Sequence, residues 1–136
     1  AVEYFEEHFY NSGSKWVLSE EKLLEADALR QRALREPVLA LAAAQVLYLY
    51  SWFRSTGEII RDNIVASAQL FETSIKAAGC DPQLPTEIWV DSACDIRWAQ
   101  AAMLYNWLGE TEVDAAVGAE FRGRGLSLLN GLKAHP

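Results

Sequence analysis

The sequence predicts an all-α fold of about six helices, packed as antiparallel helical hairpins around a buried central helix. Apolar residues recur at helical spacing along most of the chain, and no segment shows sustained alternation of apolar and polar residues. The stretch 37–53 is apolar or aromatic except for Gln45 and Ser51. A helix that is hydrophobic all the way round must be covered on every side, so we expect 37–53 at the centre.

A membrane span is the weaker interpretation of 37–53. A helix of this length extends about 26 Å, which is short of the roughly 30 Å hydrocarbon core of a bilayer. Glu36 and Arg54 bracket the stretch, and the rest of the chain is acidic and polar. We therefore expect a helix covered by protein and no membrane partner.

The length of the chain indicates how many domains it forms, and its net charge limits which partners it can bind. A chain of 136 residues fits a single domain, 1–136, which we divide into N-terminal helices (1–36), a first hairpin (37–79) and a second hairpin (86–134). The net charge is −7, with 12 basic against 19 acidic residues. Binding to nucleic acid depends on basic side chains that neutralise phosphates, so we expect no direct contact with DNA or RNA. The acidic early region favours a basic protein partner or is a solvated face.

The two cysteines indicate neither a disulfide scaffold nor a metal site. Cys80 and Cys94 form no Cys-x-x-Cys pair and no cluster with histidine, so we expect no metal and no cofactor. Reduced cysteines in the cytoplasm or nucleus fit this usage best. The chain opens at Ala1 without an initiator Met, which leaves open an origin as an excised piece of a longer protein.

Three helices are expected in the first half of the chain. Residues 2–10 read as a short helix, broken at 11–14. Ser19 is a suitable N-cap for a helix that runs to about Leu34, with two acidic residues in its first turn. Pro37 then begins the central helix.

The next elements are marked by turn and cap signals. Ser55 and Glu58 have capping-box spacing before a helix over about 58–78, which Gly79 ends. Two prolines make 80–85 the clearest linker in the chain.

Two further helices are expected in the second hairpin. Thr86 caps a long helix to about Leu108, and 109–111 turns the chain. Thr111 and Asp114 have capping-box spacing for a last helix over about 112–132. Glycines weaken that last helix by up to about 1 kcal/mol each: Gly118, Gly123 and Gly125.

One internal similarity joins the two halves. Residues 44–56 share Ala-Gln-x-x-x-Leu-Tyr-x-Trp and a later threonine with residues 99–111. Gln, Leu and Trp at this spacing share one face of a helix. The similarity indicates either two helical hairpins that pack alike or a binding surface at the Trp and Tyr ends.

Two family resemblances follow from these residues. Residues 68–76 with Asp81-Pro82, and residues 104–110 with Ala116, Phe121 and Leu126, resemble parts of a tetratricopeptide repeat. The 55-residue period departs from that family's 34. Residues 44–57, 67–79, and Trp89-Val90 with Arg97 are similar to the helical regulatory region of fungal zinc-cluster and zinc-finger transcription factors. Both resemblances imply protein contact or regulation rather than catalysis.

No catalytic set can be assembled by spacing, so we expect no enzyme activity. His8 and His135 lie near opposite ends of the chain, and Ser19, three residues before Lys22, is better explained as a helix cap than as a nucleophile. An acidic ridge is expected on the long helix of the second hairpin, either solvated or docking a basic partner: Glu87, Asp91 and Asp95.

These observations leave two functional hypotheses. The first is a non-catalytic interaction or regulatory domain with an acidic rim, whose partner is a protein, basic or a second copy. Tyr and Trp are enriched at interface hot spots, and they supply its candidate anchors: Tyr48, Tyr50, Trp52, Trp98, Tyr105 and Trp107. The alternative is a small-molecule sensor in which the aromatics line a pocket with a few polar groups: Gln45, Gln100 and Arg97.

Overall fold

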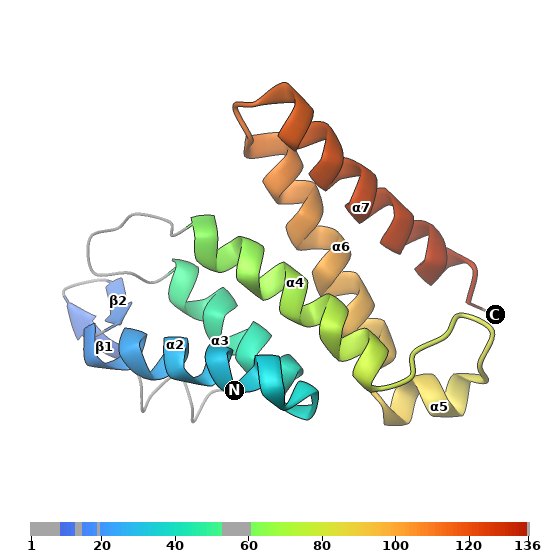
Figure 1. Cartoon of the computed structure of the whole chain (residues 1–136), viewed down its shortest axis with the longest axis horizontal. Helices are drawn as coiled ribbons and strands as arrows, with labels where there is room; N and C mark the ends of the chain where they lie inside the picture. Colours follow the sequence, from blue (N-terminus) through green and yellow to red (C-terminus); the bar gives the residue numbers. More distant parts are fainter. Residues whose placement is uncertain (1–8, 13–14, 19, 53–60, 136) are drawn as a thin grey trace.

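The structure, a computed structural model, describes the backbone of residues 9–12, 15–18, 20–52 and 61–135, and side-chain surroundings over 24–49 and 61–135. Helices dominate these ranges, so the all-α class is confirmed. These ranges contain six α-helices, labelled in Figure 1: α2 (Glu20–Arg35), α3 (Ala40–Trp52), α4 (Arg61–Ala77), α5 (Thr86–Asp91), α6 (Cys94–Thr111) and α7 (Ala115–Lys133). A short 3₁₀ helix, η1 (Pro37–Leu39), precedes α3.

A small β-hairpin lies before α2. Strands β1 (Phe9–Ser12) and β2 (Lys15–Leu18) pair antiparallel, with Phe9 opposite Leu18. The helix expected over 2–10 is therefore wrong at residues 9 and 10, and its remainder lies outside the described residues. Both strands contain aromatic or β-branched residues, which favour strands, but four residues are too few for alternation to be visible in the sequence.

The helix at the centre of the molecule is α4. Figure 1 shows α4 between α3 and α6, and α4 contacts both of them. Its buried residues recur at helical spacing: Ile64, Ser67, Ala68, Leu70, Phe71, Ser74 and Ile75. The hydroxyl of Ser67 donates to the carbonyl of Ala44 on α3 at 2.6 Å, so this polar group is satisfied inside the core.

The stretch 37–53 is only partly enclosed, which corrects its predicted central place. Ala43, Ala44 and Leu47 are buried, but Ala42 and Gln45 are exposed. The face with Ala43, Ala44 and Leu47 packs against neighbouring helices, whereas the face with Ala42 and Gln45 stays accessible to solvent. The prediction that 37–53 is covered on every side is therefore wrong for this exposed face. No helix among the described residues is both long and apolar enough to cross a membrane.

Two arginines join α4 and α6 at opposite ends. Arg61, at the start of α4, donates to the carbonyl of Leu108 at 2.6 Å and pairs with Glu112 at 3.0 Å. Arg97, in the first turns of α6, donates to the carbonyl of Ser74 near the end of α4 at 3.2 Å. Each cation therefore lies at the negative end of the partner helix, where the macrodipole favours it.

Helices α6 and α7 run side by side in opposite directions (Figure 1), and glycines set their closest approach. Gly118 and Gly125 are buried there. A Cβ added at Gly125 would lie 3.1 Å from the carbonyl oxygen of Ala102 and 3.2 Å from the amide nitrogen of Asn106. These glycines therefore pack the last helix, whereas the sequence indicated only that they weaken it. Asp114, not Thr111, caps α7, accepting from the amides of Ala116 and Val117.

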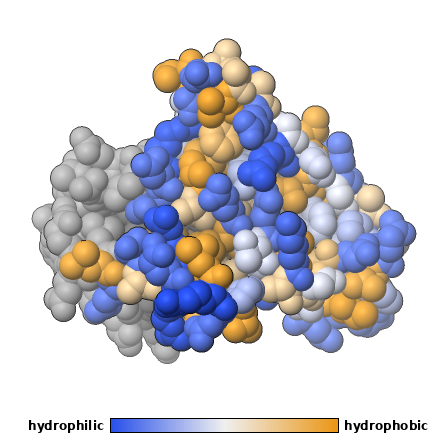
Figure 2. Space-filling model, viewed as in Figure 1, coloured by the Kyte–Doolittle hydropathy of each residue, from blue (hydrophilic) through white to orange (hydrophobic). Residues whose placement is uncertain are grey.

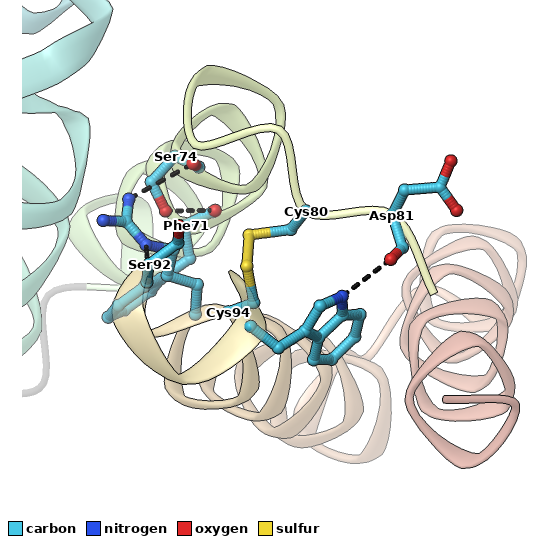
Figure 3. The surroundings of a disulfide bond; sticks show 8 residues. Phe71, Ser74, Cys80, Asp81, Ser92 and Cys94 are labelled. Carbon is cyan, nitrogen blue, oxygen red and sulfur yellow. Dashed lines mark hydrogen bonds between the residues drawn. A yellow bond between two sulfur atoms is a disulfide. The ribbon is translucent and has the colours of Figure 1, made fainter. Parts of the chain in front are cut away.

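The long helix expected over 86–108 is interrupted. α5 ends at Asp91, and Ala93 has a left-handed backbone (φ 53°) before α6 begins at Cys94. Cys80 and Cys94 form a disulfide beside this break (Figure 3), and their Cα atoms lie 5.6 Å apart. The expectation of reduced cysteines is therefore corrected. The bond ties the start of α6 to the loop after α4, a long-range restraint that no local sequence signal contains.

An aromatic stack closes this end of the molecule. Trp89 of α5 is buried and donates its indole N–H to the carbonyl of Asp81 at 2.6 Å (Figure 3). Its ring stacks on His135 with centroids 3.9 Å apart and on Trp98 at 5.4 Å. The C-terminal end of the chain is thereby held against α5.

Candidate functional site

An apolar cavity of about 460 Å³ lies among α2, α3, α4 and α6. Most of its described lining residues are aliphatic or aromatic, and none is charged: Leu29, Ala42, Gln45, Val46, Tyr48, Leu49, Phe71, Ile96 and Gln100. The polar side-chain groups among them are the two amides and the Tyr48 hydroxyl. We call this space the glutamine cavity.

The helical repeat explains how these residues meet. Ala42, Gln45 and Leu49 are three and four positions apart on α3, so they share the face that its neighbours leave open. Ile96 and Gln100, four positions apart, form the facing wall from α6. Phe71 of α4 is buried, and it closes the cavity on the core side. The small Ala42 side chain leaves room that a larger residue would fill.

The two amides have different surroundings. Gln45 is exposed, so solvent reaches the cavity beside it. The Oε1 atom of Gln100 is buried and has no hydrogen-bond partner in the described part of the chain. A buried acceptor without a partner costs about 1–3 kcal/mol, and such atoms are uncommon in native proteins.

Two of the three predicted pocket residues are brought together, and the third is not. Gln45 and Gln100 occupy equivalent positions in the repeated pattern and line the same cavity. Arg97 does not line this cavity, because its guanidinium group donates to the carbonyls of Ser92 and Ser74. Burial lowers the pKa of Arg97 below its ordinary value.

The described aromatic anchors do not form one surface. Tyr105 is completely buried and belongs to the core. Trp98 is half-buried and donates its indole N–H to the carbonyl of Leu128, while Trp107 lies beneath the guanidinium of Arg61 at 5.6 Å. Tyr48 lines the glutamine cavity. Burial of Tyr105 contradicts its predicted anchor role, whereas for Tyr48, Trp98 and Trp107 that role stays a prediction. Tyr50 and Trp52 lie on α3, and their side chains are outside the described residues.

The acidic ridge is also corrected. Glu87, Asp91 and Asp95 are all exposed, but the first two lie on α5 and the third on α6. The left-handed residue Ala93 between the helices breaks the i, i+4, i+8 spacing on which a common face depended.

Sequence reasoning missed a second groove, of about 300 Å³, between α6 and α7. Three of its large apolar residues are exposed: Met103 (50%), Leu126 (58%) and Leu129 (39%). Leu126 and Leu129 are three positions apart and so share one face of α7, which is the sequence signal for this groove. On the face in Figure 2, hydrophobic residues form separate small groups among hydrophilic ones.

Metal ligands do not gather in the described part of the chain, where no group of three or more His, Cys, Asp or Glu residues could hold an ion. Comparison with known proteins finds no family, no curated protein and no solved structure that matches this chain. The site's own geometry therefore carries the functional argument.

Proposed function

We propose that this chain is a non-catalytic binding domain that takes a small, mostly apolar molecule in the glutamine cavity. One observation carries the proposal: four helices enclose a mostly apolar cavity of about 460 Å³, which Gln45 and Gln100 line from two of them. Ligand sites are typically cavities of about 300–1,000 Å³ with apolar walls and a few polar groups. The alternative hypothesis from the sequence thereby gains more support than the protein-contact hypothesis.

The chemistry of the wall favours binding over catalysis. General acid–base catalysis needs a titratable group within hydrogen-bond reach of the reacting atom. Among the described lining residues, Tyr48 is the one ionisable side chain, and there is no histidine, carboxylate or cysteine. These lining residues fit a sensor, in which binding of a ligand in the cavity changes how the surrounding helices pack.

Thermal unfolding with a panel of uncharged apolar compounds tests the proposal. A ligand at a hundred times its Kd stabilises the native state by about 2.7 kcal/mol, which raises Tm by several degrees. Ala42→Phe should abolish the shift by filling the cavity, whereas the matched variant Ala119→Phe, on an exposed position of α7, should keep it. Absence of any shift, or equal shifts in both variants, contradicts the proposal.

A second proposal retains protein contact, in the form of self-association through the α6–α7 groove. The exposed side chains of Met103, Leu126 and Leu129 support it. Arg122 is the one charged residue among the groove's described lining residues, and it already donates to the carbonyl of Gly109, so two copies would meet little like-charge repulsion. Sedimentation velocity should give a dimer that Leu126→Glu dissociates and Ser127→Glu does not. A native monomer at all concentrations rejects it.

The cellular location is also a proposal. Cytoplasm or nucleus was expected on the basis of reduced cysteines. Disulfides persist in oxidising compartments and are rare in those two places, so the Cys80–Cys94 bond supports an oxidising compartment instead. Alkylation of protein from intact cells, followed by mass measurement, distinguishes the two: two modified thiols would favour the cytoplasm or nucleus.

A further inference from the structure

The two sides of the glutamine cavity differ in their contact with water. Phe71 and Val46 are buried, so they form an apolar floor on the core side. Ala42 and Gln45 of α3 and Ile96 of α6 are exposed, so they lie where the cavity opens to solvent. The cavity therefore extends from an opening that water reaches to a floor that water does not reach.

A polar side chain that a ligand can reach lies on the open side. Gln45 is the more exposed of the two glutamines, and Oε1 of Gln100 is buried. The side chains of Phe71 and Val46 carry no polar atom. Burying a polar group without a hydrogen bond is costly, so a ligand should place its apolar part on the floor and keep its polar part near Gln45 and water.

The lining residues also limit the charge of the polar part. Among the described ones there is no cation to pair with an anion and no carboxylate to pair with a cation. A charged group between the walls would lose part of its hydration without gaining an opposite charge. An amide both donates and accepts hydrogen bonds, so the Gln45 side chain matches an uncharged hydroxyl or amide group.

We propose that the cavity takes an uncharged amphiphile, with its apolar end against Phe71 and a hydroxyl or amide head beside Gln45. This inference rests on the proposed function and adds the class of ligand and its orientation. Gln45 is then the residue that determines which head group binds.

Straight-chain alcohols from propanol to decanol test the apolar end. Equilibrium dialysis against the native chain gives Kd for each. Affinity should rise about fourfold for each added CH₂ group, the effect of burying one more such group. The rise should stop once the alkyl chain reaches the floor. Affinity that does not depend on chain length, or that rises without limit over the whole series, overturns the enclosed position of the apolar end.

Three compounds with the same eight-carbon chain test the head. Octanol is uncharged, octanoate carries a carboxylate and octylammonium carries an ammonium group. Octanol should bind on the order of tenfold tighter than either ion, because the described lining residues offer no opposite charge. An ion that binds as tightly as octanol overturns the uncharged class.

A charge introduced at position 45 locates the head. In Gln45→Lys the affinity for octanoate, relative to octanol, should rise about threefold, as expected for a partly exposed ion pair. The matched variant Gln69→Lys changes the net charge equally at an exposed position of α4 outside the cavity lining, and it should leave this ratio unchanged. Equal changes in both variants overturn the placement of the head beside Gln45.

The orientation can also be measured without a variant. Intermolecular nuclear Overhauser effects should join the terminal methyl of octanol to the methyls of Val46, and the CH₂ next to its hydroxyl to the methyl of Ala42. The reverse pattern overturns the orientation.

The outcomes separate this inference from the proposed function. Failure of the head or orientation tests, while uncharged apolar compounds still bind, overturns the inference and leaves the binding cavity standing. Binding of no compound in either series, together with no thermal shift from the compound panel, overturns both.

Discussion

At the residue scale, Tyr105 joins the core to two charged side chains. It is completely buried, its ring lies 6.2 Å from that of Phe121, and its hydroxyl accepts from Arg124 at 3.4 Å. Burial raises the pKa of Tyr105 above its ordinary value of 10.0; the charge of Glu72 and a hydrogen bond to Glu72 raise it further, and Arg124 opposes them. The folded state therefore keeps this proton at a pH where the unfolded chain loses it.

Stability should consequently fall at high pH. A raised folded-state pKa gives a contribution that is complete below the unfolded value of 10.0 and declines as pH rises above it. Urea unfolding between about pH 8 and 11 should show this decline. Tyr105→Phe should flatten the curve above pH 10, because phenylalanine has no proton to lose; an unchanged slope would show that other groups dominate.

Some of the predicted site residues could be placed from a local sequence pattern, and others depend on how the helices pack. Gln45 and Gln100 interrupt apolar helical faces in a repeated pattern, and that local signal pointed to both glutamines that line the cavity. Arg97 was misassigned because its partners, the carbonyls of Ser74 and Ser92, are set by how α4 meets α6. Tyr105 was misassigned because composition does not distinguish a core aromatic from a surface one.

At the element scale, the packing of α7 on α6 depends on the absence of a side chain at Gly125. Added there, a Cβ would meet backbone atoms of Ala102 and Asn106 at 3.1 and 3.2 Å, and backbone cannot rotate away. Gly125→Ala should therefore destabilise the fold by about 1–3 kcal/mol, the usual effect of overpacking.

Gly123 is the matched control for that prediction. It is exposed in the same helix, and an added Cβ would meet nothing within 4 Å. Gly123→Ala should stabilise by up to about 1 kcal/mol, because alanine is the better helix former. Denaturant unfolding of both variants decides: changes of the same sign would contradict the described contact.

The disulfide is the second restraint at this scale. It closes a loop with a sequence separation of 14, for which the entropic gain is about 3 kcal/mol. Replacing both Cys80 and Cys94 by alanine should lower the free energy of unfolding by about that amount. Dithiothreitol should destabilise the native chain similarly and leave the double variant unaffected; equal sensitivity of both chains would contradict this role.

Helix ends were predictable where their causes are local. Gly79, with φ 67°, ends the helix that precedes the linker, as its sequence indicates. The break at Ala93 was not predictable, because no glycine or proline marks it. The pairing of Cys80 with Cys94 beside it is also not visible in the local sequence. The turn expected at 55–58 lies outside the described residues.

At the scale of the whole molecule, the cavity follows from the position of α4. With α3 on one side of α4 and α6 on the other (Figure 1), the open face of α3 and the pocket face of α6 converge over Phe71. The sequence correctly predicted the all-α fold class, although not the β-hairpin of β1 and β2. It misjudged which helix is enclosed, because hydrophobicity alone does not tell a core face from the wall of a binding site.

Methyl-resolved NMR of the chain with the uncharged apolar compound that gives the largest thermal shift tests most directly the claim that this wall binds a ligand. We expect methyl resonances of Leu29, Val46, Leu49 and Ile96 to shift on titration, while those of Leu126 and Leu129 in the α6–α7 groove stay in place. Shifts confined to the groove, or no shifts at either place, would contradict the account.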